Sequence, residues 1–173
     1  MKNLVFLCVF FAFSLNGSTA SSNSADAWGP LNVLVGEWTG EGGGKPGQGP
    51  GNMSVTWDLN RQVMINKGHS EYPATKDHPA TVHDSLMVIF KDPSGEKLRA
   101  TYFDSEGHVI QYAVESSENP TTIRFVSDAL PSAPRFRLTY IRRENDMGVK
   151  FEIAPPGKPD AFTPYVEGTV RRK

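Results

Sequence analysis

Apolar and polar residues alternate along most of the chain beyond residue 50. In the first such segment, Met53, Val55 and Trp57 are separated by single polar residues. A period of two is typical of a β-strand with one buried face. From this pattern we predict strands near residues 35–41, 53–59, 62–72, 82–91, 98–102, 108–115, 123–125, 136–140, 149–153 and 166–170.

Turn signals separate the predicted strands. Asp-Pro-Ser-Gly at 92–95 favours a tight turn, because proline suits the second position and glycine the last. Asp-Ser-Glu-Gly at 104–107 predicts another. Short strands at a spacing of roughly 8–12 residues, without a long helix, indicate an all-β fold. Since sequence neighbours can pair and closure removes exposed edges, we expect an antiparallel up-and-down β-barrel of about ten strands rather than a sandwich.

The stretch at residues 30–40 starts the predicted barrel. An apolar segment at 31–35 can form one short helical turn, and Gly36-Glu37-Trp38 follows it into the first strand. We expect the turn to close one end of the barrel. Gly36 would let the backbone pass closely, and Trp38 would fill the floor. On the last strand the apolar residues occupy even positions, which places Arg172 on the inward face. The alternative is that residues 171–173 form a solvated basic tail.

The N-terminal residues have the pattern of an export signal. Lys2 precedes an apolar run at 4–15, and Ser18-Thr19-Ala20 fits a small-x-small cleavage site. The run is shorter than the roughly 20 residues that span a bilayer. We therefore predict a signal peptide at 1–20, a flexible tail at 21–29 and a barrel domain at 30–173. The expected destination is the periplasm or the extracellular space, with no membrane-spanning segment left after cleavage.

Charge and cysteine content narrow the possible partners. The chain has 18 basic and 19 acidic residues and a formal net charge of −1, so no electrostatic footprint for nucleic acid is present. The one cysteine, Cys8, lies in the predicted signal peptide. The exported chain would have no disulfide, so burial of apolar surface must stabilise it.

The G-x-W element at residues 36–38 and four longer segments carry a resemblance to a known family. Residues 34–42, 83–89, 100–109 and 135–140 resemble a bacterial family of exported, uncharacterised proteins with calycin-like β-barrels, similar to lipocalins and fatty-acid-binding proteins. The resemblance implies a floor tryptophan covered by a basic residue of the last strand, here Trp38 and Arg172. It also implies an interior that can take up a small molecule.

A more distant resemblance is to nitrobindin-like haem-binding barrels, which share the opening glycine–tryptophan element. Those proteins bind haem iron through a histidine late in the chain, whereas the last histidine here is His108. We therefore expect no cofactor, with haem or metal binding as the alternative. For a metal, His69 and His83 flank one connection and could meet near Asp84, Asp104 or Glu71. The other interpretation is that these histidines are structural.

The predicted interior is aromatic with few polar groups. Trp57, Tyr102, Tyr112 and Tyr140 all fall on the inward face, and His108 shares the apolar face of its strand. Such an interior suits a small, largely apolar ligand that a few polar groups orient. Two alternatives stay open. Side chains could fill the barrel completely, and His108 could serve only to tie its turn to Asp104.

Catalytic and nucleotide-binding motifs are weak. No G-x-S-x-G element occurs, and the exported chain would lack a cysteine nucleophile. The glycines at 42, 44 and 47 match G-x-G-x-x-G, but prolines interrupt them and a strand follows, so we expect a loop at the barrel rim. The sequence favours a carrier or sensor over an enzyme. A hydrolase or isomerase using His108 with a carboxylate is the remaining alternative.

Overall fold

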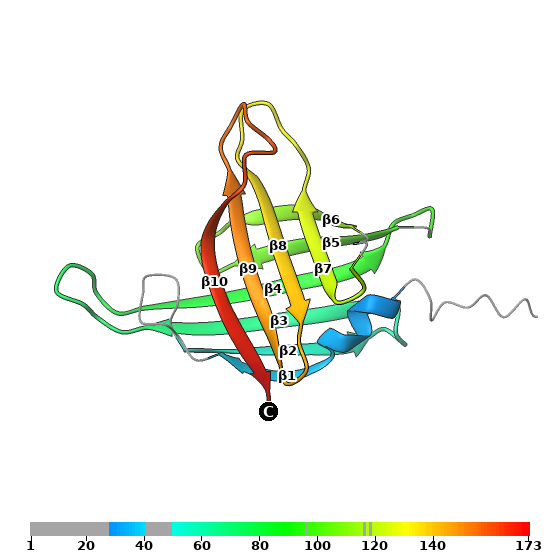
Figure 1. Cartoon of the computed structure of the whole chain (residues 1–173), viewed down its shortest axis with the longest axis horizontal. Helices are drawn as coiled ribbons and strands as arrows, with labels where there is room; N and C mark the ends of the chain where they lie inside the picture. The colour runs from blue at the N-terminus through cyan, green and yellow to red at the C-terminus, as the bar shows by residue number, and fades with distance from the viewer. Residues whose placement is uncertain (1–27, 41–49, 96, 116, 118) are drawn as a thin grey trace, which may run out of the picture.

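A computed structural model describes residues 28–40, 50–95, 97–115, 117 and 119–173. In this part of the chain, one short 3-10 helix is followed by ten antiparallel strands that close into a barrel (Figure 1). The predicted fold class is confirmed. The predicted signal peptide, residues 21–27 of the predicted tail and residues 41–49 of the glycine-rich loop lie outside the described residues.

The elements follow one another with short connections. They are η1 (Gly29–Leu34), β1 (Gly36–Gly40), β2 (Gly51–Asp58), β3 (Val63–Tyr72), β4 (Thr81–Lys91), β5 (Leu98–Asp104), β6 (Val109–Glu115), β7 (Thr122–Ser127), β8 (Arg135–Arg142), β9 (Asp146–Ala154) and β10 (Thr163–Arg172). Each strand pairs with its sequence neighbours, and β1 closes the ring against β10. This is the up-and-down order that the alternation predicts.

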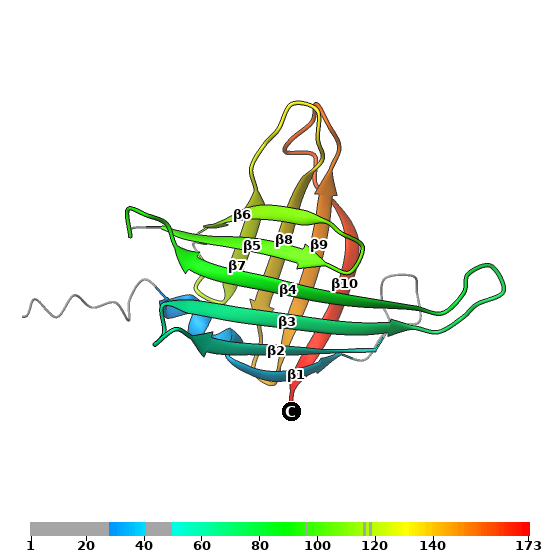
Figure 2. The ribbon, with the colours of Figure 1, turned by 180° about the vertical axis from the view of Figure 1, so that it is seen from behind.

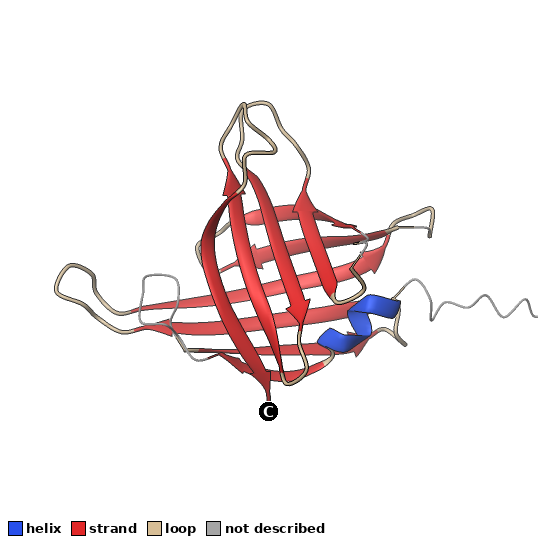
Figure 3. Ribbon diagram, in the orientation of Figure 1, coloured by secondary structure: helices blue, strands red, loops and turns tan. Residues whose placement is uncertain are grey.

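The strands form two groups that cross at a steep angle. Strands β1–β6 run across the view and β7–β10 run up it, and the view from behind shows the same crossing (Figures 1 and 2). Helix η1 covers one end of the enclosed space, which we call the floor (Figure 3). We call the opposite end, where β5 turns into β6 and β9 into β10, the mouth. Among the described residues, no helix is both long enough and apolar enough to cross a bilayer.

The floor is fixed by hydrogen bonds to the end of η1. The indole Nε1 of Trp38 donates to the carbonyl of Leu34 at 2.7 Å. The guanidinium of Arg172 donates to the carbonyls of Val35 at 2.9 Å and Val33 at 3.2 Å, and its Cζ lies 4.6 Å from the Trp38 ring centroid. The predicted Trp38–Arg172 contact is present. These donors satisfy carbonyls that a helix end leaves without a partner.

Gly36 allows this close arrangement. Its φ is +137°, a conformation that residues with a Cβ rarely adopt, and an added Cβ would lie 2.5 Å from Nη1 of Arg172. Trp28, ahead of the predicted domain start at residue 30, is also part of the floor. It is buried and packs edge-on against Trp57, with ring centroids 4.9 Å apart. Folded structure therefore begins by residue 28.

An ion pair with a buried carboxylate stabilises the outer face of β8 and β9. Arg137 donates to both carboxylate oxygens of Glu152, from Nε at 2.6 Å and from Nη2 at 2.9 Å. Lys150 adds a contact at 3.3 Å. The Glu152 side chain is only 6% exposed. The hydrogen bonds from Arg137 hold the pKa of Glu152 below its ordinary value, against the opposing effect of burial.

We expect this pair to make the barrel sensitive to acid. Because the folded-state pKa of Glu152 is lowered, its contribution is present above the unfolded pKa, about 4.3, and is lost as the pH falls through the folded value. Glu152→Gln should cost about 2 kcal/mol of unfolding free energy at pH 7, and the difference from wild type should shrink toward pH 3. Urea unfolding across this pH range measures it. Glu167→Gln, at an exposed carboxylate paired with Lys150, should change stability by under about 1 kcal/mol; equal effects of the two changes would contradict the role of Glu152.

Candidate functional site

The interior is filled at the floor and open at the mouth. Inward-facing residues of the floor half are buried, namely Trp38, Val55, Met64, Ile89, Ile123 and Met147. Several inward-facing residues of the mouth half are partly exposed, namely Ser70, Ser85, Ile110, Val149, Phe151 and Val166, whereas Ser127 at the end of β7 is buried. Gly168, which faces inward on β10, has no atom within 4 Å of the position a Cβ would take. Open space therefore adjoins Gly168 on the inward face of β10.

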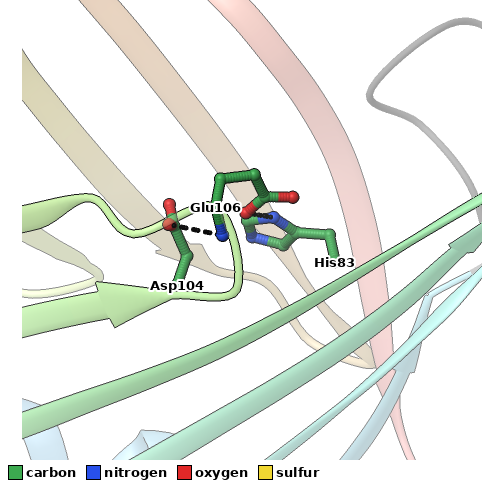
Figure 4. A group of neighbouring side chains, drawn as sticks. All are labelled: His83, Asp104 and Glu106. Atoms are coloured by element: carbon green, nitrogen blue, oxygen red, sulfur yellow. Dashed lines mark hydrogen bonds and ion pairs between the residues drawn. The ribbon is translucent and has the colours of Figure 1, made fainter.

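A polar cluster lies at this mouth (Figure 4). His83 is near the start of β4, Asp104 ends β5, and Glu106 is in the following turn. His83 Nδ1 lies 2.9 Å from Glu106 Oε2, and His83 Nε2 lies 3.1 Å from the hydroxyl of Tyr102. One nitrogen or oxygen from each of His83, Asp104 and Glu106 falls within 4.8 Å of the other two. These three residues, with Tyr102 beside them, form what we call the mouth cluster.

Asp104 is positioned by the turn that it begins. Its Oδ1 accepts the backbone N–H groups of Glu106 at 3.1 Å and His108 at 2.8 Å, and its Oδ2 lies 2.8 Å from His108 Nδ1. Gly107 takes a φ of +88°, which suits glycine in a tight turn. Burial acts to raise the pKa of Asp104, but the hydrogen bonds from His108 outweigh it and lower that pKa. The carboxylate is therefore ionised and fixed in direction.

The interior tyrosines stay protonated. Burial raises the pKa of Tyr102 and of Tyr112, and it raises the pKa of Tyr140 to about 12. The Tyr140 hydroxyl accepts from the Asn66 amide at 3.1 Å and donates to the sulfur of Met53 at 3.7 Å. Tyr102 is therefore a neutral hydroxyl at the mouth, where it is hydrogen-bonded to His83, while Tyr140 is hydrogen-bonded to Asn66 and Met53.

The structure separates the residues predicted to bind a ligand. Tyr102, Tyr112 and Tyr140 all face inward, as predicted. Trp57 also faces inward, but it lies at the floor, between Trp28 and the guanidinium of Arg61, whose Cζ is 4.6 Å from the Trp57 ring centroid. Trp57 is therefore part of the floor packing, whereas the Tyr102 hydroxyl is hydrogen-bonded to His83 at the mouth.

An inward position for His108 is wrong. The residue precedes β6, in the turn after Asp104, and its side chain is 68% exposed. The alternative interpretation is correct, since the imidazole ties the turn to Asp104. His108 lies in the turn before β6, where side chains do not alternate between the two faces of the sheet. The inward direction of Ile110 and Tyr112 therefore does not apply to His108.

The proposed meeting of His69 and His83 is also wrong. His69 pairs with Asp84 across β3 and β4, whereas His83 pairs with Ser70, so the two histidines project from opposite faces of the sheet. His69 lies outside, with Nδ1 2.7 Å from Asp84 and Nε2 3.3 Å from Glu71. Hydrogen bonding to Asp84, then to Glu71, raises the pKa of His69. The sequence did not indicate Glu106; the turn signal at 104–107 was the available clue.

A second hollow, of about 510 Å³, lies on the outer face of β1–β5. Its lining includes outward side chains of Glu37, Asn52, Lys67, His69, Asp84 and Phe103. The hollow is open to solvent and does not include His83, Tyr102 or Glu106. Its lining also includes Ser85 and Asp104, which are on the inward parity of β4 and β5, so Asp104 of the mouth cluster borders this hollow.

No family model matches the chain. It is similar to cubilin of Canis lupus familiaris, at 25% identity over 129 residues. The match covers 70% of this chain and 4% of cubilin, so the chain spans a small part of that relative. Neither result places the chain in a family.

Proposed function

We propose that this chain is an exported binding barrel that carries or senses a small, largely apolar molecule. The observation that supports this is the change along the interior, from buried side chains at the floor to partly exposed ones at the mouth. The proposed cavity is bounded by Ile110, Val149 and Phe151, with space beside Gly168. The predicted export leader and the sequence resemblance to calycin-like barrels support the same proposal.

The chemistry of the cavity suggests the ligand class. Aliphatic and aromatic side chains supply most of the wall, which favours burial of an apolar body. The Tyr102 hydroxyl and the His83 imidazole lie at the mouth end. A few polar groups at one end orient a ligand that has an apolar body and a single polar group. We therefore expect such a molecule to lie with its polar end toward the mouth.

Filling the cavity should remove the ligand. Gly168→Leu places a side chain in the open space inside β10 and should lower the occupancy of a co-purified organic ligand by about tenfold or more, with little change in melting temperature. Native mass spectrometry of gently purified protein measures occupancy. Glu167→Leu adds the same side chain to the outer face of the same strand and serves as the matched control. A wild-type chain that carries and takes up no apolar molecule, or a Gly168→Leu variant that binds as well as wild type, would exclude the proposed cavity.

A further inference from the structure

We propose that His83, Asp104 and Glu106 bind one divalent transition-metal ion at the barrel mouth. The proposal does not require the apolar ligand, because the metal ligands belong to the polar rim, and His83 is the residue that it shares with the polar end of the proposed cavity. The three ligand atoms lie within 4.8 Å of one another. Ligands about 2.0–2.2 Å from a common ion are separated by roughly 3–4 Å, so small side-chain rotations would complete the site.

The hydrogen bonds of His83 favour a cation beside it. If Nε2 carries the proton and donates to the Tyr102 hydroxyl, 3.1 Å away, Nδ1 presents a lone pair. That lone pair faces a carboxylate oxygen of Glu106 at 2.9 Å. Two acceptors at this distance require a proton or a metal ion between them. In that tautomer the Tyr102 hydroxyl accepts from Nε2 and would be the hydrogen-bond partner that a histidine ligand usually has behind it.

Asp104 is the most constrained of the three ligands. Its side chain is 6% exposed, and the Glu106 and His108 backbone N–H groups and the His108 imidazole hold it in place. Hydrogen-bonded carboxylates are characteristic of metal sites, where such partners orient the ligand. One imidazole and two carboxylates suit zinc, iron(II) or manganese(II), with further positions open to water or a small ligand.

The outer histidine supplies a matched comparison. His69 also has two carboxylates next to it, but Asp84 lies at Nδ1 and Glu71 at Nε2. An ion bound to one ring nitrogen cannot reach both carboxylates. In the mouth cluster, by contrast, Glu106 and Asp104 both come within reach of the same ion. Both histidines therefore have two carboxylates beside them, but only at His83 can a single ion reach both carboxylates.

Cobalt(II) titration of the tag-free full chain, after chelator treatment and dialysis, tests the site. We expect uptake of one ion per chain with a visible absorption band, and competition by zinc. His83→Ala and Glu106→Gln should weaken cobalt binding by about 10- to 100-fold, whereas His69→Ala should leave it unchanged. Glu106 is an exposed turn residue, so Glu106→Gln should fold normally, and circular dichroism checks both site variants. No uptake by wild type, unchanged binding in both site variants, or equal loss in His69→Ala would overturn the site.

Discussion

Replacing Phe125 with alanine should lower the free energy of unfolding by about 4 kcal/mol, near the middle of the range for buried phenylalanines. Phe125 is fully buried on the inward face of β7. Its ring packs edge-on against Tyr112, with centroids 6.3 Å apart, and against Tyr140, at 6.1 Å. Truncation removes both aromatic contacts and leaves a cavity between rigid strands that cannot collapse to fill it. Urea unfolding followed by tryptophan fluorescence measures the loss.

Phe103→Ala is the control for this prediction. Phe103 points outward from β5 and is 40% exposed, so its truncation should cost about 1 kcal/mol or less. The two substitutions remove the same atoms from the two faces of one barrel. If both variants lose the same stability, the assignment of inward and outward faces is incorrect.

Strict alternation made most of this barrel predictable. Over residues 98–102, 110–112 and 136–140 the apolar residues occupy even positions, so Tyr102, Tyr112 and Tyr140 could be placed inside from the sequence. The floor was predictable for a similar reason, since counting in twos along the last strand gave Arg172 the same face as Val170. Where one face is clearly apolar, burial alone determines which side chains point inward.

The alternation is ambiguous on β4, and this is where the predicted site fails. Leu86, Val88 and Phe90 form one apolar face, while Met87 and Ile89 form the other. Only the pairing with β5 shows that Met87 lies inside, opposite Tyr102. His83 shares the face of Met87 and is therefore inward. The sequence pattern does not contain the register that decides this.

The mouth cluster also depends on the geometry of one turn. Asp104 and Glu106 are two residues apart, a spacing that would put them on the same face of a strand, but β5 ends at Asp104 and Glu106 lies in the turn that follows. The turn signal predicts the reversal of the chain and not the direction of each side chain. Glu106 reaches His83 because the turn folds back over β4, where the Ser105 backbone N–H donates to the carbonyl of Asp84 at 2.9 Å. This long-range contact is absent from any local pattern.

Trp38→Ala should be comparably severe, with a loss of about 4 kcal/mol. The substitution removes a side chain that is 5% exposed and the donor that satisfies the carbonyl of Leu34. It also removes the surface on which Arg172 lies. Trp38→Phe keeps an aromatic ring but loses the hydrogen bond, and should cost about 1–3 kcal/mol for the unsatisfied carbonyl. Both values come from urea unfolding at pH 7, and a Trp38→Phe variant as unstable as Trp38→Ala would show that the ring packing contributes little.

A comparison of Arg172 with Arg61 distinguishes the cation–π contact of a floor guanidinium from its hydrogen bonds to backbone carbonyls. Each has its Cζ 4.6 Å from an indole centroid, Arg172 over Trp38 and Arg61 over Trp57. Arg172 also donates to the carbonyls of Val33, in the last turn of η1, and Val35, directly after it. If the cation–π contact alone stabilises the floor, Arg172→Ala and Arg61→Ala should cost the same, about 0.5–1 kcal/mol. Arg172→Ala leaves two backbone carbonyls without their donor, whereas Arg61→Ala loses only a long contact of 3.5 Å to Asn32 Oδ1. We therefore expect Arg172→Ala to lose about twice as much stability or more. Equal losses would mean that water satisfies the carbonyls at the end of η1.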